Sequence, residues 1–246
     1  MKPTLLVLQF HEGDRDQAMA LARLLADILR HNEHHILFFA RYDCEHDIAT
    51  IRYCRQYFHT VLEGRSTRRI KGWPIGPNAM AMDVFQLSHE KHKAGEWDYE
   101  SIMLLESDCV PLNNNWLELI RQEWREGNQL LLGHWIGKKA DPARSHMNGN
   151  LMFSPRLTFT VPALLEPRVP VLAWDVYFWK AYSRFARASK LIYSDYRVKF
   201  TTCEDLFAPR KYEKGHPLGE CQVQPAWLHG CKDSRAMGCV RDKLLP

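Results

Sequence analysis

The stretch that decides the fold is S-I-M-L-L-E-S-D-C-V-P-L, residues 101–112. Its apolar run at residues 102–105 is short and uninterrupted, which is typical of a strand buried on both faces of a parallel sheet. The run ends abruptly in two carboxylates, Glu106 and Asp108. We expect Pro111, which has no backbone N–H, to stop further strand pairing. The stretch therefore predicts an inner strand of an α/β sheet with two acids at its carboxyl end.

The position of these two acids indicates a ligand site. In open α/β sheets, ligands gather beyond the carboxyl ends of the strands. Two acids this close do not both stay ionised easily unless a cation or a proton donor faces them. A hard divalent cation that also binds phosphate oxygens would satisfy both. The alternative is an acidic turn with solvated side chains, and the tripeptide Glu106-Ser107-Asp108 alone does not decide between them.

Length and composition describe an ordinary globular protein. The 246 residues fit one large α/β domain, and 46% hydrophobic with 25% charged residues excludes disordered and fibrous classes. The net charge of +4 is compatible with an anionic substrate or a nucleic acid. No apolar stretch is long enough to span a bilayer, and the run at residues 5–8 is shorter than a signal-peptide core. We therefore predict a soluble cytoplasmic protein without membrane contact.

The seven cysteines include no C-x-x-C pair, so a disulfide framework is not expected. Zinc binding by Cys221, His229, Cys231 and Cys239 is an alternative, although their spacings match none of the usual zinc patterns.

Apolar periodicity predicts alternating strands and helices over most of the chain. The predicted strands are residues 4–10, 35–40, 59–63, 102–105, 130–135, 151–153 and 221–224. The predicted helices are residues 17–29, 47–58, 79–91, 116–124 and 174–182. Residues 138–150 and most of the chain from residue 209 onward are predicted to be loop. Strands joined through helices by short connections form βαβ units, which predict a parallel sheet with right-handed crossovers.

Two segments before the central strand suggest phosphate binding. The loop G-W-P-I-G-P-N at residues 72–78 leads to Asn78, the expected N-cap of the helix at 79–91. The unpaired backbone N–H groups of the helix N-terminus would lie there, where they could bind a phosphate. Neither a P-loop nor a dinucleotide fingerprint is present. A basic cluster precedes the loop, and it is either a solvated face or a phosphate-facing patch. The cluster consists of Arg65, Arg68, Arg69 and Lys71.

In this order, the segments resemble the GT-A-fold glycosyltransferases, which use a nucleotide-activated sugar. The loop glycines Gly72 and Gly76, Asn78 at the helix start and the aliphatic strand match that family, and Glu106-Ser107-Asp108 stands for its Asp-x-Asp motif with Glu in the first place. The resemblance implies one α/β domain over residues 1–246, with a mostly parallel Rossmann-type sheet flanked by helices. Residues 1–112 would bind the nucleotide sugar. Residues 113–246 would bind the acceptor and carry the catalytic group.

The resemblance also implies roles for later residues. Asp175 matches the family's catalytic base, with helix capping as its competing role and Asp205 as the reserve candidate. His229 matches the histidine that completes the metal site. Asp108 would bind Mn²⁺ or Mg²⁺ directly, and Glu106 would be a second ligand or would hold the ribose or a metal-bound water. The segment at residues 146–150 matches an acceptor-side glycine segment.

Further residues are expected to bind the nucleotide part of the donor. Gln9 and His11 end the first strand and Asp43 ends the second, so they are placed to meet the nucleoside. Gly76 and Asn78 belong to the loop that would approach the phosphates. Lys232 would pair with a phosphate, or else it is a surface lysine.

The acceptor is a hydroxyl compound that the sequence does not identify. The basic cluster, the Lys138-Lys139 pair and Arg184 with Arg187 favour a polyanion. One candidate is therefore a hydroxymethylated pyrimidine in DNA, the acceptor of phage-type glycosyltransferases, and base flipping would then be required. Two competing classes stay open: a nucleotidyltransferase of similar α/β fold, and a non-catalytic module that binds a nucleotide sugar.

Overall fold

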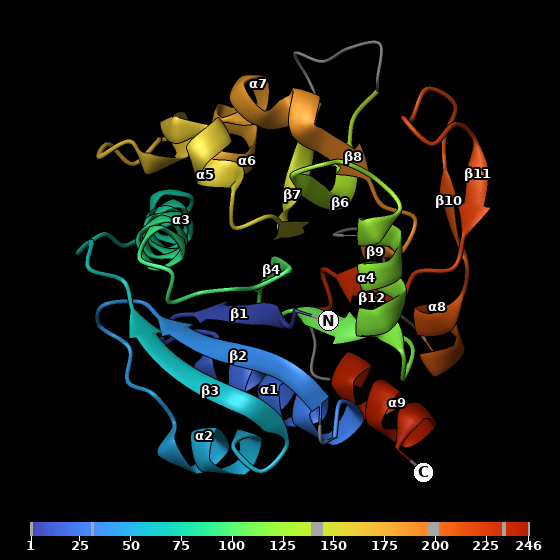
Figure 1. Cartoon of the computed structure of the whole chain (residues 1–246). Coiled ribbons are helices and arrows are strands. Elements are labelled where there is room, and N and C mark those ends of the chain that lie inside the picture. Colours follow the sequence, from blue (N-terminus) through green and yellow to red (C-terminus); the bar gives the residue numbers. More distant parts are fainter. Residues whose placement is uncertain (1, 31, 139–144, 196–201, 233–234, 246) are drawn as a thin grey trace.

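A seven-stranded sheet lies at the centre of the computed structural model, which describes residues 2–30, 32–138, 145–195, 202–232 and 235–245 (Figure 1). The strand order is β3-β2-β1-β4-β7-β6-β8. Four of the six neighbouring pairs are parallel, and the two that involve β7 are antiparallel. The predicted α/β fold with a mostly parallel central sheet is therefore confirmed. The strands are β1 Thr4–Phe10, β2 Asn32–Ala40, β3 Phe58–Arg65, β4 Ser101–Leu105, β6 Leu131–Ile136, β7 His146–Phe153 and β8 Ala186–Ala188.

The inner strands of this sheet are apolar on both faces. In β1, Leu6 and Leu8 contribute to one hydrophobic cluster and Leu5 and Val7 to the other, and all four are fully buried. All five residues of β4 are buried as well. Burial on two faces explains why the sequence has uninterrupted aliphatic runs here and no polar alternation.

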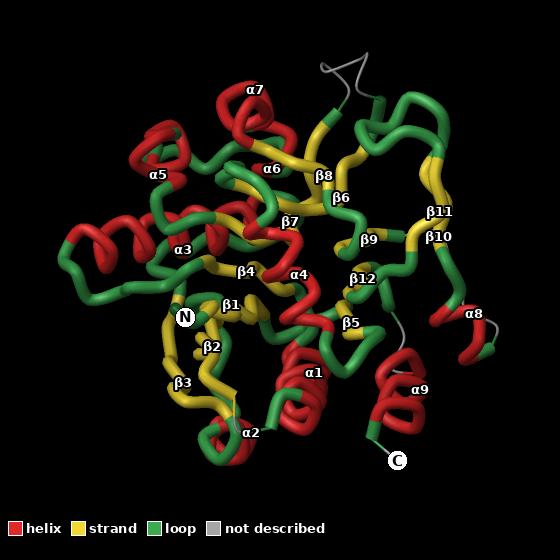
Figure 2. The backbone as a smooth tube through the Cα atoms, turned by 45° about the vertical axis from the view of Figure 1, so that its right-hand side comes forward, coloured by secondary structure: helices red, strands yellow, loops and turns green. Residues whose placement is uncertain are grey.

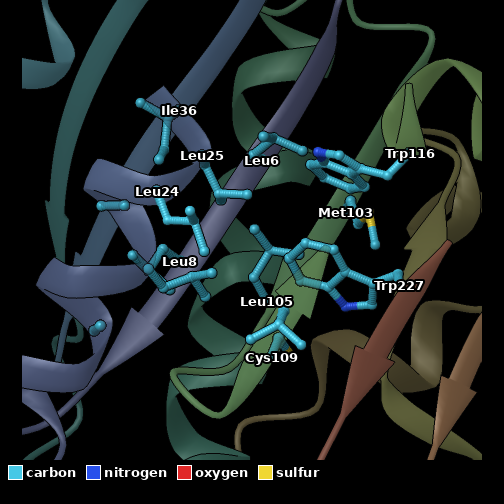
Figure 3. Close-up of a cluster of buried hydrophobic side chains, with 14 of the residues drawn as sticks. Leu6, Leu8, Leu24, Leu25, Ile36, Met103, Leu105, Cys109, Trp116 and Trp227 are labelled. Carbon is cyan, nitrogen blue, oxygen red and sulfur yellow. The ribbon is translucent and has the colours of Figure 1, made fainter. Parts of the chain in front are cut away.

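Four helices cover one face of the sheet. Leu24 and Leu25 of α1 share a cluster with Leu6 and Leu8, and Trp116 of α4 lies 4.5 Å, centroid to centroid, from Trp227 (Figure 3). In Figures 1 and 2 the last helix, α9, lies beside α1, so the C-terminal end of the chain returns to the N-terminal half. These helices are α1 Arg15–Ile28, α2 Ile48–Cys54, α4 Trp116–Arg125 and α9 Arg235–Leu244.

The opposite face is covered by a long helix, α3 Ile75–Lys93, and by shorter helices. Phe85 of α3 contacts Phe153 and Trp174 edge-on, at centroid distances of 5.2 and 5.1 Å. The single helix predicted at residues 174–182 is wrong, because the chain breaks at Phe178 into two short helices. The short helices are α5 Leu157–Thr160, α6 Trp174–Tyr177 and α7 Trp179–Tyr182, with 3-10 turns at Pro162–Leu165 and Ser183–Phe185.

A second sheet of three strands follows the carboxyl end of β4. It contains β5 Cys109–Pro111, β12 Trp227–His229 and β9 Ile192–Ser194, with β12 in the middle. β12 is antiparallel to β5 and parallel to β9. Pro111 lies opposite Trp227, so the prediction that Pro111 stops pairing is wrong. A proline is tolerated at the end of a strand that pairs along one edge, because no N–H is needed on its other side.

Two segments predicted as loop contain regular structure. β7 begins at His146, within the loop expected at residues 138–150, of which residues 139–144 lie outside the described part. The C-terminal part holds β12, α9 and an antiparallel pair, β10 Arg210–Tyr212 with β11 Cys221–Val223. These late strands have only three residues each, too few to show a periodic pattern.

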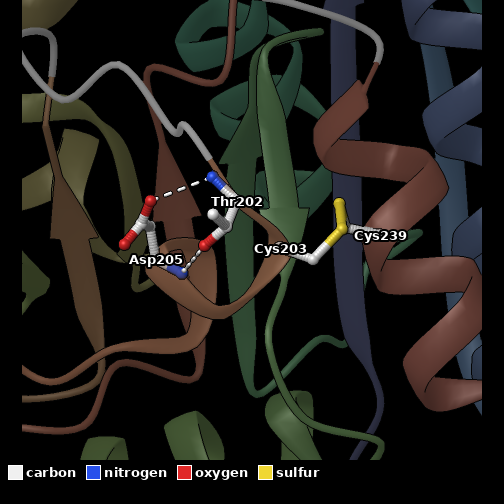
Figure 4. Close-up of a disulfide and its surroundings, with 4 residues drawn as sticks. All are labelled: Thr202, Cys203, Asp205 and Cys239. Carbon is white, nitrogen blue, oxygen red and sulfur yellow. Dashed lines mark hydrogen bonds between the residues drawn. A yellow bond between two sulfur atoms is a disulfide. The ribbon is translucent and has the colours of Figure 1, made fainter.

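One disulfide joins Cys203, the first residue of α8 (Cys203–Phe207), to Cys239 in α9 (Figure 4). The other five cysteines form no disulfide, so this single bond is the exception to the expected lack of disulfides. Asp205 and Thr202 form a capping box at the start of α8: Thr202 N donates to Asp205, and Asp205 N donates to Thr202 Oγ1. Among the described helices, none combines the length and apolar character that crossing a membrane requires.

Candidate active site

The turn from Glu106 to Asp108 connects β4 to β5 and lies at the carboxyl end of the central sheet. Both strands are buried, which fixes the two ends of the turn. The Asp108 side chain is 7% exposed, whereas the Glu106 side chain is 48% exposed. The two acids therefore differ: Asp108 is held inside the protein, and Glu106 reaches toward solvent.

His229 reaches these acids because β12 pairs with β5. The register places His229 opposite Cys109, next to the turn. Its Nε2 atom lies 3.0 Å from Glu106 Oε2 and 3.0 Å from Asp108 Oδ1. Its Nδ1 atom lies 2.8 Å from Ser194 Oγ on β9, so the orientation of the ring is fixed from both sides.

Charge in this cluster is balanced between acids and bases. Burial alone would raise the pKa of Asp108, but hydrogen bonds and charge from His229 and Lys232 outweigh it and lower the pKa to about 2. Burial alone would lower the pKa of His229, but Asp108 and Glu106 outweigh it and raise the pKa to about 9. Lys232 Nζ lies 2.9 Å from Asp108 Oδ2. The site is thus built to hold positive charge beside two carboxylates.

The donor atoms also fit a divalent cation. Within the described ranges, Glu106, Asp108 and His229 are the one group of three His, Cys, Asp or Glu residues whose ligand atoms all lie within 4.8 Å of one another. Two carboxylate oxygens and an imidazole nitrogen suit Mn²⁺ and Mg²⁺, and the nitrogen suits Mn²⁺ better. The alternative zinc site is not assembled, because Cys239 is in the disulfide and His229 belongs to this cluster.

Two buried asparagines, from the segment at residues 146–150 that the resemblance assigned to the acceptor side, hold the turn. Asn150 Oδ1 accepts hydrogen bonds from Glu106 N at 2.8 Å and from Cys109 Sγ at 2.9 Å. Asn148 Oδ1 in turn accepts from Asn150 N at 3.0 Å. Both asparagines lie in the first part of β7, up to residue 150, which was expected to be loop. Two asparagines flanking a glycine, just before a predicted strand, are the pattern from which a structural role could have been predicted.

A cleft of about 740 Å³ opens in front of the cluster. It is bordered by the ends of β1 and β4, the start of α3, β7 and the segment before α6. Gly149 of β7 also lines the cleft, and a Cβ there would lie at ordinary contact distance, 3.5 Å, from both Glu106 Oε1 and Trp174 Nε1. Of the predicted site residues, the cleft is lined by Gln9, His11, Asn78, Glu106, Asp108, Asp175 and Lys232. His229 lies behind it and contacts Glu106 and Asp108.

Asp175 is buried at the edge of this cleft, at the start of α6. Burial, together with the charge of Glu106, raises the pKa of Asp175 to about 7. Tyr182 Oη donates to the Asp175 carbonyl at 2.6 Å, and Val176 N donates to Asp175 Oδ1 at 3.0 Å. The reserve candidate, Asp205, caps α8 and does not line the cleft.

The start of α3 differs from the prediction. The helix begins at Ile75, so Asn78 is inside the first turns and is not its N-cap. Prolines at positions 74 and 77 are accommodated there because the first helical N–H groups have no intrahelical partner. The Asn78 side chain donates to the carbonyls of Pro170 and Leu172 and accepts from Trp174 N at 2.8 Å. Asn78 therefore fixes the segment that carries Asp175.

Near β1, Asp14 is another residue that the sequence reasoning missed as part of the site. It accepts from His11 N at 2.7 Å and from Ser107 Oγ at 3.1 Å, and so connects the end of β1 to the acidic turn. The spacing of Asp14, three residues after His11 in a predicted turn, is the pattern from which its hydrogen bond to the His11 N–H could have been predicted.

The remaining predicted nucleotide-binding residues, Gly76 and Asp43, do not line the cleft. Gly76 lies in the first turn of α3, and its N–H donates to the Gly72 carbonyl. Asp43 follows β2, where hydrogen bonds from Arg41 and Lys71 lower its pKa well below the usual range. Their roles in nucleotide binding stay predictions.

The basic cluster at residues 65–71 is largely neutralised by acids. Arg65 pairs with Glu45 at 3.1 Å, Arg68 with Asp83 at 2.8 Å and Lys71 with Asp43 at 2.8 Å. Three of its four cations are thus in ion pairs, which reduces the positive potential offered to a polyanion.

Comparison with known proteins identifies the fold. No protein-family model and no curated protein sequence matches the chain. Solved glycosyltransferase structures match it with a TM-score of 0.56 each: the bifunctional enzyme WbbM at 10% identity over 99% of this chain, LgtC at 12% over 98%, and mouse xyloside xylosyltransferase 1 at 13% over 93%. The chain spans 50% of the WbbM chain, 94% of LgtC and 97% of the mouse protein. It therefore has the GT-A-type fold of these glycosyltransferases.

Proposed function

We propose that this protein is a metal-dependent glycosyltransferase that moves a sugar from a nucleoside-diphosphate sugar to a hydroxyl acceptor. The observation that carries the proposal is the convergence of Glu106, Asp108 and His229 on one point at the edge of a cleft that also contains Asp175. The GT-A-type fold supports it, and among the proteins of that fold LgtC has been crystallised with donor and acceptor sugar analogs.

Glu106, Asp108 and His229 would hold Mn²⁺ or Mg²⁺, and Ser194 would keep the His229 ring oriented. When bound, the cation neutralises negative charge that develops on the leaving diphosphate. Lys232 is 2.9 Å from Asp108 and lines the cleft, so it adds positive charge on the same side. Gln9 and His11 line the cleft at the end of β1, where they would meet the nucleoside. Asp43 lies further out and would act only through a nucleoside that extends past the end of β2.

Asp175 is the proposed general base. The acceptor hydroxyl gives its proton to the Asp175 carboxylate while its oxygen forms a bond to the anomeric carbon. The bond from that carbon to the diphosphate oxygen breaks, and its electron pair leaves with the diphosphate. A single displacement of this kind inverts the configuration at the anomeric carbon. A pKa of about 7 suits a carboxylate that must accept a proton near neutral pH.

The acceptor remains the open part of this proposal. Hydroxymethylpyrimidine in DNA was predicted in part from the basic cluster, and the ion pairs of Arg65, Arg68 and Lys71 weaken that part of the argument. The DNA acceptor and the cytoplasmic location therefore stay predictions. Turnover on hydroxymethylcytosine-containing DNA, with strong dependence on salt, is the result that would support the DNA acceptor.

The test is donor consumption by the wild-type chain with a panel of sugar nucleotides and Mn²⁺. We expect one donor to be hydrolysed slowly, with release of a nucleoside diphosphate. Asp108→Asn is expected to reduce kcat/KM by about 100-fold or more, because it removes the buried carboxylate that holds the cation. Asp98→Asn is the matched control, since the side chain of Asp98 is 72% exposed.

The outcomes separate the competing classes. Release of pyrophosphate would instead identify a nucleotidyltransferase. Binding of a sugar nucleotide without any consumption would identify a non-catalytic module. Consumption of a donor that is unchanged in Asp108→Asn would contradict the proposed role of the cluster.

A further inference from the structure

The cleft has an apolar rim on the side of Trp73 and Val176. Among the described residues, seven large apolar side chains are exposed, and five of them lie in two segments, from which Trp73 and Val176 line this cleft. Trp73 precedes α3 and is 84% exposed. The other four are Val171, Leu172, Val176 and Tyr177, around the start of α6.

The two segments are held beside each other by Asn78. Its side chain donates to the carbonyls of Pro170 and Leu172 and accepts from Trp174 N. Its own N–H donates to the carbonyl of Pro74, the residue after Trp73. Asn78 thus connects the Trp73 loop to the segment at residues 170–176. The hydrogen bonds of Asn78 therefore hold the two parts of the apolar rim in place.

The rim is continuous with the proposed catalytic centre. Trp73 and Val176 line the same cleft as Asp175 and Glu106, and Val176 is the residue next to Asp175. Exposed apolar groups concentrated at the edge of a cleft are typical of a ligand-binding surface. A molecule lying on this rim would present its edge to the Asp175 carboxylate.

We infer that Trp73, with Val176 and Tyr177, forms the acceptor subsite and that it takes a neutral sugar ring. This inference rests on the proposed function and names its substrate class. An exposed indole offers a flat apolar face to the C–H face of a pyranose, while the hydroxyl groups of that ring stay hydrated or face Asp175.

Charge favours a neutral acceptor over a nucleic acid. Two of the cations that precede Trp73 in sequence are engaged, Lys71 with Asp43 and Arg68 with both Asp83 and the Pro167 carbonyl. A phosphate backbone crossing the rim would need free cations, since phosphate contacts supply most of the affinity for nucleic acid. A neutral ring needs none.

The test measures binding of methyl glycosides by NMR titration, with and without a nucleoside diphosphate and Mn²⁺. The indole N–H resonance that disappears in Trp73→Phe identifies Trp73 among the eight tryptophans. We expect this resonance to shift with at least one neutral glycoside. Trp73→Phe should keep the binding within about twofold, and Trp73→Ala should weaken it by about 5–10-fold.

The matched control is Phe159→Ala, because Phe159 is also an exposed aromatic residue, 48% exposed, and stacks on His89 away from the cleft. It should leave glycoside binding unchanged. Absence of binding by any glycoside, or equal binding by Trp73→Ala, would overturn the inference, and so would binding of nucleosides or DNA oligonucleotides to Trp73 in place of glycosides. Failure of the proposed function looks different: no donor is consumed, while the glycoside titration still reports on Trp73.

Discussion

At the scale of single residues, Asp175 is an acid placed where its charged form is unfavourable. Burial favours the neutral form in the folded protein and raises the pKa from 3.8 to about 7. In the unfolded chain the same carboxyl ionises at its ordinary pKa. The folded state therefore binds this proton more tightly, so the contribution of Asp175 to the free energy of unfolding falls as pH rises from about 4 to about 7 and is then constant.

This linkage predicts that Asp175→Asn is more stable than the wild type at pH 8, by on the order of 2–4 kcal/mol, and about equal at pH 4. The amide has the same shape and no charge to desolvate. The measurement is urea unfolding of both proteins at the two pH values without metal. Asp98→Asn, at an exposed position, should show no such pH dependence. A stability difference that is the same at both pH values would mean that folding does not shift the pKa of Asp175.

Asn150 is a second residue with a testable role, because it positions the acidic turn without contacting the ligand. Asn150→Ala removes the acceptor of the Glu106 N–H and leaves that group unpaired, as Asn150 is fully buried. We expect Mn²⁺ affinity to fall by about tenfold or more, as is common when partners of metal ligands are removed. Calorimetric Mn²⁺ titration of Asn150→Ala, with the exposed Asn114→Ala as control, measures this. Unchanged affinity would show that the turn keeps its shape without Asn150.

At the scale of elements, the Cys203–Cys239 bond joins α8 to α9 across 36 residues. Closing a loop of this length restricts the unfolded chain, which stabilises the protein by about 3–4 kcal/mol in the chain-entropy model. We predict that Cys203→Ser and Cys239→Ser each lower the free energy of unfolding by up to this amount. The double variant should be no less stable than either single variant, because all three lose the same bond. Cys221→Ser, at a free cysteine, is the control. Additive losses would argue that the two thiols act separately.

The length of each helix and strand also explains which of them the sequence could predict. The long aliphatic strands and α1, α3 and α4 were recognisable, because each buries enough residues to produce a pattern. β5, β9 and β12 were not, since each has only three residues and exists through its partners. Asn78 looked like a helix cap because it follows a Gly/Pro-rich loop, yet tertiary hydrogen bonds to residues 170–174 determine its position.

At the scale of the whole molecule, the candidate site could be predicted in part. Glu106 and Asp108 were indicated by their place after an inner strand, and His229 by the order of segments that resembles the glycosyltransferases. The contact between His229 and Glu106 spans 123 positions, so no local pattern could reveal it. Asn150, Asp14 and Trp73 were missed, because their roles depend on which strands and loops become neighbours.

Donor binding should stabilise the whole chain. A ligand at a concentration one hundred times its Kd adds about 2.7 kcal/mol, which corresponds to roughly 5–10 °C in Tm for a chain of this size. We predict that a nucleoside diphosphate and Mn²⁺ together raise Tm by more than the sum of their separate effects. The thermal shift should be lost in Asp108→Asn and kept in Asp98→Asn. Equal shifts with and without Mn²⁺ would separate nucleotide binding from the metal cluster.

The pairing of β12 with β5 has a consequence for biosynthesis. His229 comes from one of the last strands made, whereas Glu106 and Asp108 emerge from the ribosome much earlier. Until the late strand docks, the acidic turn lacks the imidazole of His229. Prematurely terminated translation products, and chains clipped by proteases ahead of residue 227, would therefore lack the complete Glu106, Asp108 and His229 cluster even where their earlier strands have folded.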